Sequence, residues 1–230
     1  MFIFKIMNKD KIFLELDKWV SDKGNGGYVH IDYNPYPAVH NSHLNEEVGI
    51  QQNKEELIKF IDVLLNSNTK KCLEIGLGFF GSTHFLWRQF YENVITIEKN
   101  FERIREFGRN MKKYYGDWVL NDGRSLFFVG FSNDEKIIAD LYSKVDEVDL
   151  LFIDGNHSYQ SVLCDFLLYY PLVKKGGIIA FHDTALSEDN MGVPQLIAEI
   201  RTGKYTNGKR INMIDIVENK WSGISYFYKS

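Results

Sequence analysis

Three glycines and two acidic residues mark the first place where this chain could bind a small molecule. Gly76, Gly78 and Gly81 follow a short apolar segment that carries Glu74, and Glu98 ends the next apolar segment, 22 residues after Gly76. Glycine suits a tight turn from strand to helix, because a Cβ would prevent the backbone from approaching a ligand closely. A carboxylate at the end of the second strand can accept hydrogen bonds from both hydroxyls of a ribose. The spacing therefore predicts a site for a nucleoside cofactor.

A second group of polar residues follows two later apolar segments. Asp154 ends one of them, His157 comes shortly after it, and the pair His182-Asp183 ends the other. In open α/β sheets, ligands bind beyond the carboxyl ends of the strands. We therefore expect these side chains to meet at the same rim of a sheet as the glycine turn.

The elements that must position these residues alternate between strand and helix from residue 53 onward. The predicted strands are 72–75, 94–98, 125–129, 149–153 and 177–181. The predicted helices begin at 53 and cover 82 to about 90, 101–115, 134–143, 158–173 and 193–202. This alternation predicts an α/β fold with a doubly wound, mostly parallel sheet. Segments 211–217 and 223–228 close the chain, and their connection is too short for a crossover, so they form an antiparallel hairpin.

Residues 1–50 lack the regular pattern of the rest of the chain. They are predicted to form an N-terminal arm or lid, with a helix over 11–20. Residues 51–230 are predicted to form the domain. The arm holds three of the six histidines. It is either an irregular segment anchored by aromatic side chains or a lid that faces the substrate. The latter alternative would let it shape substrate choice.

Composition narrows the class of protein. A net charge of −4 and a pI near 5.9 give no basic footprint for nucleic acid. No apolar run reaches the ~18–20 residues of a membrane span, and the start of the chain does not read as a signal peptide. Cys72 and Cys164 lie in apolar segments without metal-type spacing, which predicts buried free thiols. We expect a cytoplasmic protein that binds neither nucleic acid nor membrane; a homo-oligomer is compatible with the sequence.

The glycine turn and the acid at Glu98 fit either a nicotinamide or flavin dinucleotide or S-adenosylmethionine. Glu74 two residues before the first glycine, the long segment ahead of the sheet and the final hairpin favour the second cofactor. At these residues the chain resembles the class I S-adenosylmethionine-dependent methyltransferases, over about 53–228. The resemblance implies a seven-stranded Rossmann-like sheet with a reversed last strand. It also implies that Glu74 and the three glycines form the first cofactor motif, with the glycine loop under the amino-acid part, and that Glu98 holds the ribose.

A narrower resemblance lies in 151–159 and 175–184, which read DGxHxY and GGxxxxHD. This pattern is similar to that of macrolide-sugar O-methyltransferases and cephalosporin hydroxylase-like proteins. In several relatives a divalent ion is bound at positions that correspond to Asp154, His182 and Asp183, and a histidine that corresponds to His157 is the proposed general base. The resemblance also implies that Asp154 takes part in cofactor binding and catalysis.

This chain departs from the pattern in two places. Relatives often carry two acids where it has His182-Asp183, and it reads Gly130-Phe131-Ser132 where a Gly-Asp-Ser-like turn is common. Phe131 could stack on the adenine, although it cannot accept a hydrogen bond from the exocyclic amine.

These features predict an S-adenosylmethionine-dependent O-methyltransferase that acts on a small hydroxylated molecule, such as a sugar or glycosylated metabolite, with Mg²⁺ or another divalent metal. Two alternatives stay open: an NAD-dependent oxidoreductase, and a methyltransferase-fold protein that binds cofactor or glycan without transfer. The individual residues also have structural alternatives. Asp154 could satisfy backbone donors in its loop, His157 could be a hydrogen-bonded structural histidine, and His182 could contact the substrate or a metal ligand instead of the metal.

Overall fold

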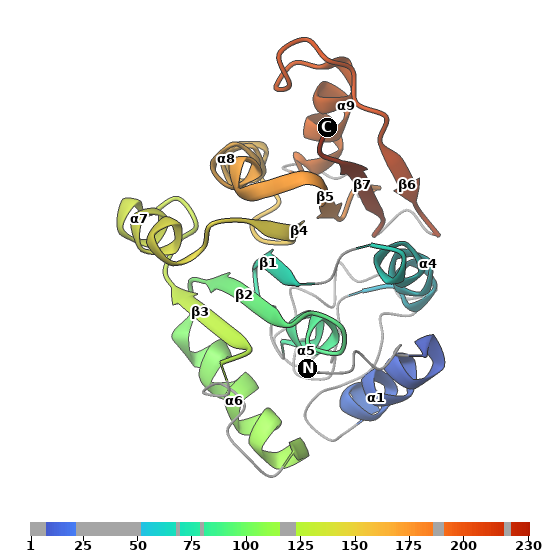
Figure 1. The fold of residues 1–230 in the computed structure, drawn as a ribbon, viewed down its shortest axis with the longest axis vertical. Helices are drawn as coiled ribbons and strands as arrows, with labels where there is room; N and C mark the ends of the chain where they lie inside the picture. The colour runs from blue at the N-terminus through green and yellow to red at the C-terminus, as the bar shows by residue number, and fades with distance from the viewer. Residues whose placement is uncertain are drawn as a thin grey trace.

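The computed structural model describes residues 8–21, 52–67, 70–78, 81–115, 123–185, 191–218 and 222–230. Its strands form one seven-stranded sheet in the order β3-β2-β1-β4-β5-β7-β6 (Figure 1). The strands are β1 Lys71–Ile75, β2 Asn93–Glu98, β3 Ser125–Val129, β4 Val148–Ile153, β5 Val173–His182, β6 Ile214–Ile216 and β7 Ile224–Tyr228. The pairs among β1 to β5 are parallel, while β7 runs antiparallel to both β5 and β6. The predicted sheet and its reversed C-terminal hairpin are confirmed.

Helices cover both faces of the sheet, as Figure 1 shows. One core lies under α1 (Lys9–Ser21), α4 (Lys54–Leu65), α5 (Ser82–Trp87) and α6 (Phe101–Tyr115). The other core lies under α7 (Glu135–Lys144), α8 (Tyr159–Tyr169) and α9 (Val193–Thr202). Strands buried on both faces explain why the predicted strands read as continuous apolar runs without alternation.

The predicted N-terminal arm lies outside the described residues except for 8–21, and so do its histidines. Within the described part, α1 packs into the first core. The indole of Trp19 stacks on the ring of Phe85 at 4.4 Å between centroids, and its Nε1 donates to Ser82 Oγ at 3.1 Å. Helix α1 is therefore part of the packed core of the molecule.

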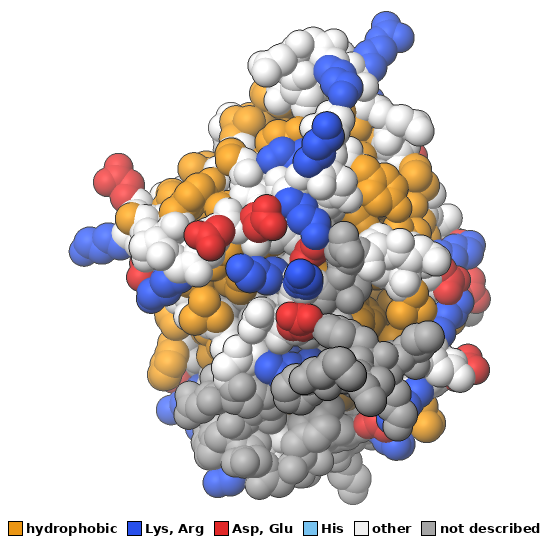
Figure 2. Space-filling model, in the orientation of Figure 1, with side chains coloured by type: hydrophobic (Ala, Val, Ile, Leu, Met, Phe, Trp, Pro, Cys, Tyr) orange, Lys and Arg blue, Asp and Glu red, His pale blue; other side chains and the backbone are white. Residues whose placement is uncertain are grey.

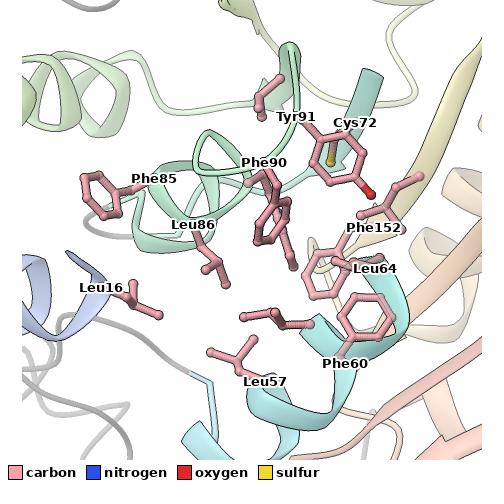
Figure 3. Close-up of a cluster of buried hydrophobic side chains, with 14 of the residues drawn as sticks. Leu16, Leu57, Phe60, Leu64, Cys72, Phe85, Leu86, Phe90, Tyr91 and Phe152 are labelled. Atoms are coloured by element: carbon pink, nitrogen blue, oxygen red, sulfur yellow. The ribbon is translucent and has the colours of Figure 1, made fainter. Parts of the chain in front are cut away.

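Helix α4 begins where the sequence predicted, because Asn53 caps it. The Asn53 Oδ1 accepts hydrogen bonds from the backbone N–H groups of Glu55 and Glu56 at 2.9 and 3.1 Å. The apolar face of the helix is buried against α1, α5 and the sheet. In Figure 3, side chains from all four elements point into a common interior, among them Leu16, Phe60, Leu86 and Phe152.

Several element boundaries differ from the sequence prediction, among them the end of α5, which lies at Trp87 instead of about 90. Helix α8 ends at Tyr169 instead of continuing to 173, because Pro171 lies in a following 3₁₀ turn, Tyr170–Leu172, and cannot donate a backbone hydrogen bond. Strand β5 consequently begins at Val173, ahead of the predicted 177, with a register shift against β4. Strand β6 pairs only over Ile214–Ile216, at the edge of the sheet.

A buried carboxylate joins α4 to the connection between β6 and β7. Glu56 is fully buried, and its Oε1 accepts from the backbone N–H of Glu218 at 2.8 Å. Its Oε2 accepts from the Ser222 hydroxyl at 2.8 Å and from the Gly223 N–H at 3.0 Å. One side chain thus satisfies three donors of a loop that is more than 160 residues away along the chain.

The surface and the cysteines complete the description. On the face shown in Figure 2, lysine and arginine side chains have acidic side chains among them. None of the helices that the structure describes is long and apolar enough to cross a membrane. Both cysteines are free; Cys72 is buried as predicted, whereas Cys164 is half-buried.

We expect Glu56→Ala to lower the free energy of unfolding by about 3 kcal/mol, because three loop donors lose a charged acceptor. Urea denaturation would measure the change. Glu55→Ala is the matched control, since it removes the same charge from an exposed position of the same helical turn. Equal midpoints for the two variants would show that Glu56 does not hold the hairpin.

Candidate functional site

The turn after β1 lies directly against the turn after β4. A Cβ on Gly76, whose φ is +94°, would lie 2.3 Å from the Asp154 carbonyl oxygen, so only glycine fits here. The Gly76 N–H donates to the Ile97 carbonyl at 2.9 Å, and the Asp154 N–H donates to the Ile75 carbonyl at 3.0 Å. The backbone of the predicted cofactor turn is therefore in direct contact with the backbone of the predicted acidic site.

Gly78 and Gly81 also have positive φ, +69° and +64°. Gly81 precedes α5, and the two residues between these glycines lie outside the described part of the chain. No atom of the described residues lies within 4 Å of the place where a Cβ of Gly78 would stand. The glycine turn thus leaves room beside its backbone at the rim of the sheet.

Glu98 closes the glycine turn from the end of β2. Its Oε2 accepts from the Leu77 N–H at 3.0 Å and its Oε1 accepts from the Asn100 N–H at 2.8 Å. Arg103 Nη1 lies 3.5 Å from the same Oε2. A carboxylate offers about four lone-pair sites, two on each oxygen, so Oε1, with one donor, keeps capacity for a hydroxyl of a bound ribose.

Phe131 lies on the loop after β3, next along the rim. Its side chain is 64% exposed, and Lys99 Nζ lies 5.9 Å from its ring centroid. The loop is held from below, where the Ser132 hydroxyl bonds the buried carboxyl of Asp165 and the Tyr169 hydroxyl donates to the Ser132 carbonyl. Burial raises the pKa of Asp165 to about 6, although the Ser132 hydrogen bond works against it. An exposed ring on an anchored loop is suited to stacking on a flat base.

Glu74 takes a different position from the other predicted cofactor residues. It is fully buried under α5, where Oε1 accepts from the Trp87 indole N–H at 3.0 Å and Oε2 from the Thr96 hydroxyl at 2.8 Å. Burial raises its pKa to about 8, against the hydrogen bonds from Thr83, Thr96 and Trp87. Glu74 therefore supports the packing of α5 below the glycine turn, and the structure does not bring its carboxylate to the rim.

The four polar residues after β4 and β5 do come together. His157 Nε2 lies 2.9 Å from Asp183 Oδ2 and 3.8 Å from Asp154 Oδ1. His182 Nδ1 lies 3.3 Å from Asp154 Oδ1 and 3.2 Å from Asp183 Oδ1. Two carboxylates and two imidazoles thus form one cluster at the carboxyl ends of neighbouring strands, as the sequence predicted.

The electrostatics of this cluster are dominated by the carboxylates. Burial disfavours the charged form of both histidines, yet Asp154 and Asp183 raise the pKa of His157 to about 10 and the pKa of His182 well above its usual range. Burial by itself would raise the pKa of Asp183. The two histidines outweigh it and lower this pKa far below the usual range. In this state, positive charge is held on the imidazoles because two acids lie close together.

The backbone around the cluster is unusual at Asp183, which has a φ of +57°. Non-glycine residues rarely adopt this conformation and do so mainly where the surroundings enforce it. The next two residues are held by the hairpin that Glu56 anchors: the Thr184 N–H donates to the Gly223 carbonyl at 3.3 Å and the Ala185 N–H to the Ser222 carbonyl at 2.8 Å.

His157 is fixed by its own loop and by the start of α9. Asn156 Oδ1 accepts from the Ser158 N–H at 2.9 Å, and Ser158 caps α8. The Gly192 N–H donates to the His157 carbonyl at 2.8 Å. A Cβ on Gly192 would lie 2.2 Å from the Cα of Tyr159, so glycine is required for this close approach.

Sequence reasoning missed Gln52, which lies just ahead of α4. Its Nε2 donates to Asp154 Oδ2 at 2.8 Å, and the residue is only 2% exposed. No periodicity or motif distinguishes this glutamine from its neighbours in the sequence. A signal would have required knowledge that residues 102 positions apart are in contact.

Asp154, His182 and Asp183 also meet the requirements of a metal site. Each offers a ligand atom, and these atoms lie within 4.8 Å of one another. The Nδ1 of His182 faces both carboxylates, whereas its Nε2 is buried and has no hydrogen-bond partner among the described residues. Carboxylates with an imidazole suit Mn²⁺, Fe²⁺ or Zn²⁺ better than Mg²⁺. These donors therefore fit a divalent cation, and one would satisfy an otherwise unpartnered nitrogen.

Comparisons with known sequences point to one family. Residues 73–184 match the model of a methyltransferase domain. Two curated relatives, both uncharacterized, are R132 of Acanthamoeba polyphaga mimivirus, 36% identical over 104 residues, and y4gI of Sinorhizobium fredii, 42% identical over 53 residues. The matches cover 42% and 23% of this chain, but 46% and 6% of the relatives. The chain thus matches less than half the length of either relative.

Solved structures with this fold include an O-methyltransferase from Bacillus cereus in complex with S-adenosylhomocysteine, with a TM-score of 0.59, 19% identity and coverage of 95% of this chain and 100% of that one. The O-methyltransferase TomG from Streptomyces achromogenes, in complex with S-adenosylmethionine, has a TM-score of 0.57, 14% identity and coverage of 80% and 83%. The mycinamycin-pathway methyltransferase MycE, in complex with Mg, S-adenosylhomocysteine and mycinamycin VI, has a TM-score of 0.50, 17% identity and coverage of 71% and 45%.

At these identities the structures establish the fold, and the domain match describes residues 73–184. The strand order with its reversed β7 and the glycine turn after β1 agree with both. Residues 73–184 of this chain therefore match a methyltransferase domain, and the chain has the fold of the S-adenosylmethionine-dependent O-methyltransferases to which it is similar.

Proposed function

We propose that the protein is an S-adenosylmethionine-dependent O-methyltransferase that acts on a hydroxyl of a small molecule, with a divalent cation held by Asp154, His182 and Asp183. The observation that carries the proposal is the position of the four-residue cluster. The cluster lies next to the glycine turn, because the backbone of Gly76 packs directly against that of Asp154. A cofactor above the glycine turn and an acceptor beside the cluster would then be neighbours.

The cofactor would be held along the rim of the sheet. The open side of Gly78 would take its amino-acid part, the spare lone pairs of Glu98 its ribose hydroxyls, and the exposed ring of Phe131 its adenine. These three contacts follow the order of β1, β2 and β3 across the sheet. Glu74 would act indirectly, through the packing of α5.

Methyl transfer from a sulfonium to a hydroxyl is an in-line displacement. The O–H bond breaks, a C–O bond forms, the C–S bond breaks, and a neutral thioether leaves. When bound, a divalent cation would lower the pKa of the acceptor hydroxyl and orient it. His157 would receive the proton at Nε2, the nitrogen that faces Asp183 and Asp154. The pKa of His157 is raised by the negative charges of Asp154 and Asp183. When a bound cation neutralises these charges, the pKa of His157 would fall and the imidazole could act as a base near neutrality.

A sugar or glycosylated metabolite is the acceptor class that the DGxHxY and GGxxxxHD segments favour. MycE, which shares the fold, is seen with Mg and mycinamycin VI. A binding protein without transferase activity is the second candidate. It is favoured by the same raised pKa of His157, since a protonated imidazole cannot accept a proton. Nothing in the family match or the fold favours the NAD-dependent oxidoreductase.

Calorimetric titration tests the cofactor and the metal together. We expect S-adenosylhomocysteine to bind and NAD not to bind, because the glycine turn and Glu98 belong to a methyltransferase domain. Titration with Mn²⁺ alone should also give a heat of binding. Heat from NAD alone would overturn the assignment, and binding of S-adenosylhomocysteine without turnover in a broad screen of hydroxylated acceptors would favour the binding protein.

Glu98→Gln should weaken S-adenosylhomocysteine binding about 10-fold, which corresponds to about 1.4 kcal/mol. The uncharged amide is a poorer acceptor for two ribose hydroxyls. Glu102→Gln, an exposed position at the start of α6, is the charge-matched control and should bind as the wild type does. An unaltered dissociation constant in Glu98→Gln would remove this residue from the ribose site.

Asp154→Asn should abolish Mn²⁺ binding and methyl transfer while it changes S-adenosylhomocysteine affinity less than about threefold. The substitution removes the charge that a cation needs but leaves the backbone against Gly76 in place. Asp140→Asn, on the exposed face of α7, controls for net charge. Retention of Mn²⁺ binding by Asp154→Asn would place the ion somewhere else and refute the proposed metal site.

A further inference from the structure

We propose that Gln52 is a positioning residue that fixes the orientation of the Asp154 carboxylate for cation binding. The inference rests on the proposed function, because it concerns the same metal site. It begins from a contact between segments far apart in the chain: a buried amide, just ahead of α4, donates to the acid that follows β4.

The two oxygens of Asp154 are used for different purposes. Oδ2 accepts from Gln52 Nε2 at 2.8 Å, whereas Oδ1 lies 3.3 Å from His182 Nδ1 and 3.8 Å from His157 Nε2. The terminal torsion of an aspartate is broad, so an unrestrained carboxylate would rotate between many orientations. The hydrogen bond from Gln52 holds Oδ2 on one side and thereby presents Oδ1 to His182 and Asp183. Such support of a ligand group is a general requirement of metal sites.

The orientation of the Gln52 amide follows from its partner. If the amide were reversed, Oε1 would face Asp154 Oδ2, and two acceptors would repel each other. In the orientation present, Oε1 is buried and has no hydrogen-bond partner among the described residues. A buried polar atom without a partner costs about 1–3 kcal/mol. Gln52 therefore keeps its hydrogen bond to Asp154 at the expense of its other polar atom.

A purely structural role at the start of α4 does not account for this side chain. The first backbone donors of the helix are already satisfied by Asn53 Oδ1, which caps it. An apolar side chain of similar length would fill the same buried volume without leaving an acceptor unpaired. The feature that requires glutamine here is the donor to Asp154.

The test is Gln52→Met, which keeps the length of the side chain and removes the donor. The full chain with Gln52→Met is titrated with Mn²⁺ by calorimetry and by electron paramagnetic resonance. Its dissociation constant for Mn²⁺ should be 10- to 100-fold higher than that of the wild type. The affinity for S-adenosylhomocysteine should stay within about threefold of the wild-type value, because the hydrogen bond of Gln52 goes to Asp154 and not to the glycine turn. Gln52→Asn, whose amide is one methylene too short, is the second variant and should weaken Mn²⁺ binding as well.

Asn53→Ala is the matched control. It loosens the same helical start by about 1 kcal/mol but leaves the amide of Gln52 in place, so its affinity for Mn²⁺ should equal that of the wild type. Equal loss in Asn53→Ala and Gln52→Met would overturn the proposal, and so would wild-type affinity in a folded Gln52 variant. If Asp154→Asn loses Mn²⁺ while Gln52→Met does not, only the role of Gln52 fails. If the wild type binds no Mn²⁺, the proposed metal site fails, and the role of Gln52 fails with it.

Discussion

The contact between Gly76 and Asp154 is the constraint on which the site depends. Strands β1 and β4 are neighbours in the sheet, so the turns that follow them leave the same rim side by side. This is the point at which the strand order reverses, where α/β sheets bind their ligands. Since a Cβ on Gly76 would lie 2.3 Å from the Asp154 carbonyl oxygen, the two turns can close together only with glycine. The distance between the cofactor turn and the acidic cluster is therefore set by backbone packing and not by flexible side chains.

The second constraint is electrostatic. Asp154 and Asp183 are brought close together at the ends of β4 and β5, where burial makes repulsion between them strong. Two imidazoles neutralise them here, which explains why the pKa values of His157 and His182 rise in spite of burial. A divalent cation could supply the same compensation at the same place. Histidine at 182 adds no negative charge to the cluster and fits a softer cation.

The sequence was sufficient for the features that depend on local pattern. The apolar runs gave the strands, and the acids at their carboxyl ends could be placed at one rim because parallel strands end at the same edge. It was insufficient where a side chain acts across the fold. Nothing in the local pattern shows that Gln52 reaches Asp154, that Glu56 holds the β6–β7 connection, or that Glu74 turns under α5 instead of toward the rim. Each of these contacts depends on tertiary packing, and local periodicity does not encode it.

The start of α4 links these observations. Gln52 reaches the acid after β4, and Glu56, one helical turn later, holds the loop that supports Thr184 and Ala185 after β5. Both sides of the acidic cluster are thus braced by the same few residues, although only one of the two contacts touches a carboxylate of the cluster. Because Asn53 caps this turn independently, its backbone does not depend on either of these side-chain contacts. A rigid helix start is a more accurate support than a loop, which explains how the fold can hold two acids at a separation that their charges oppose.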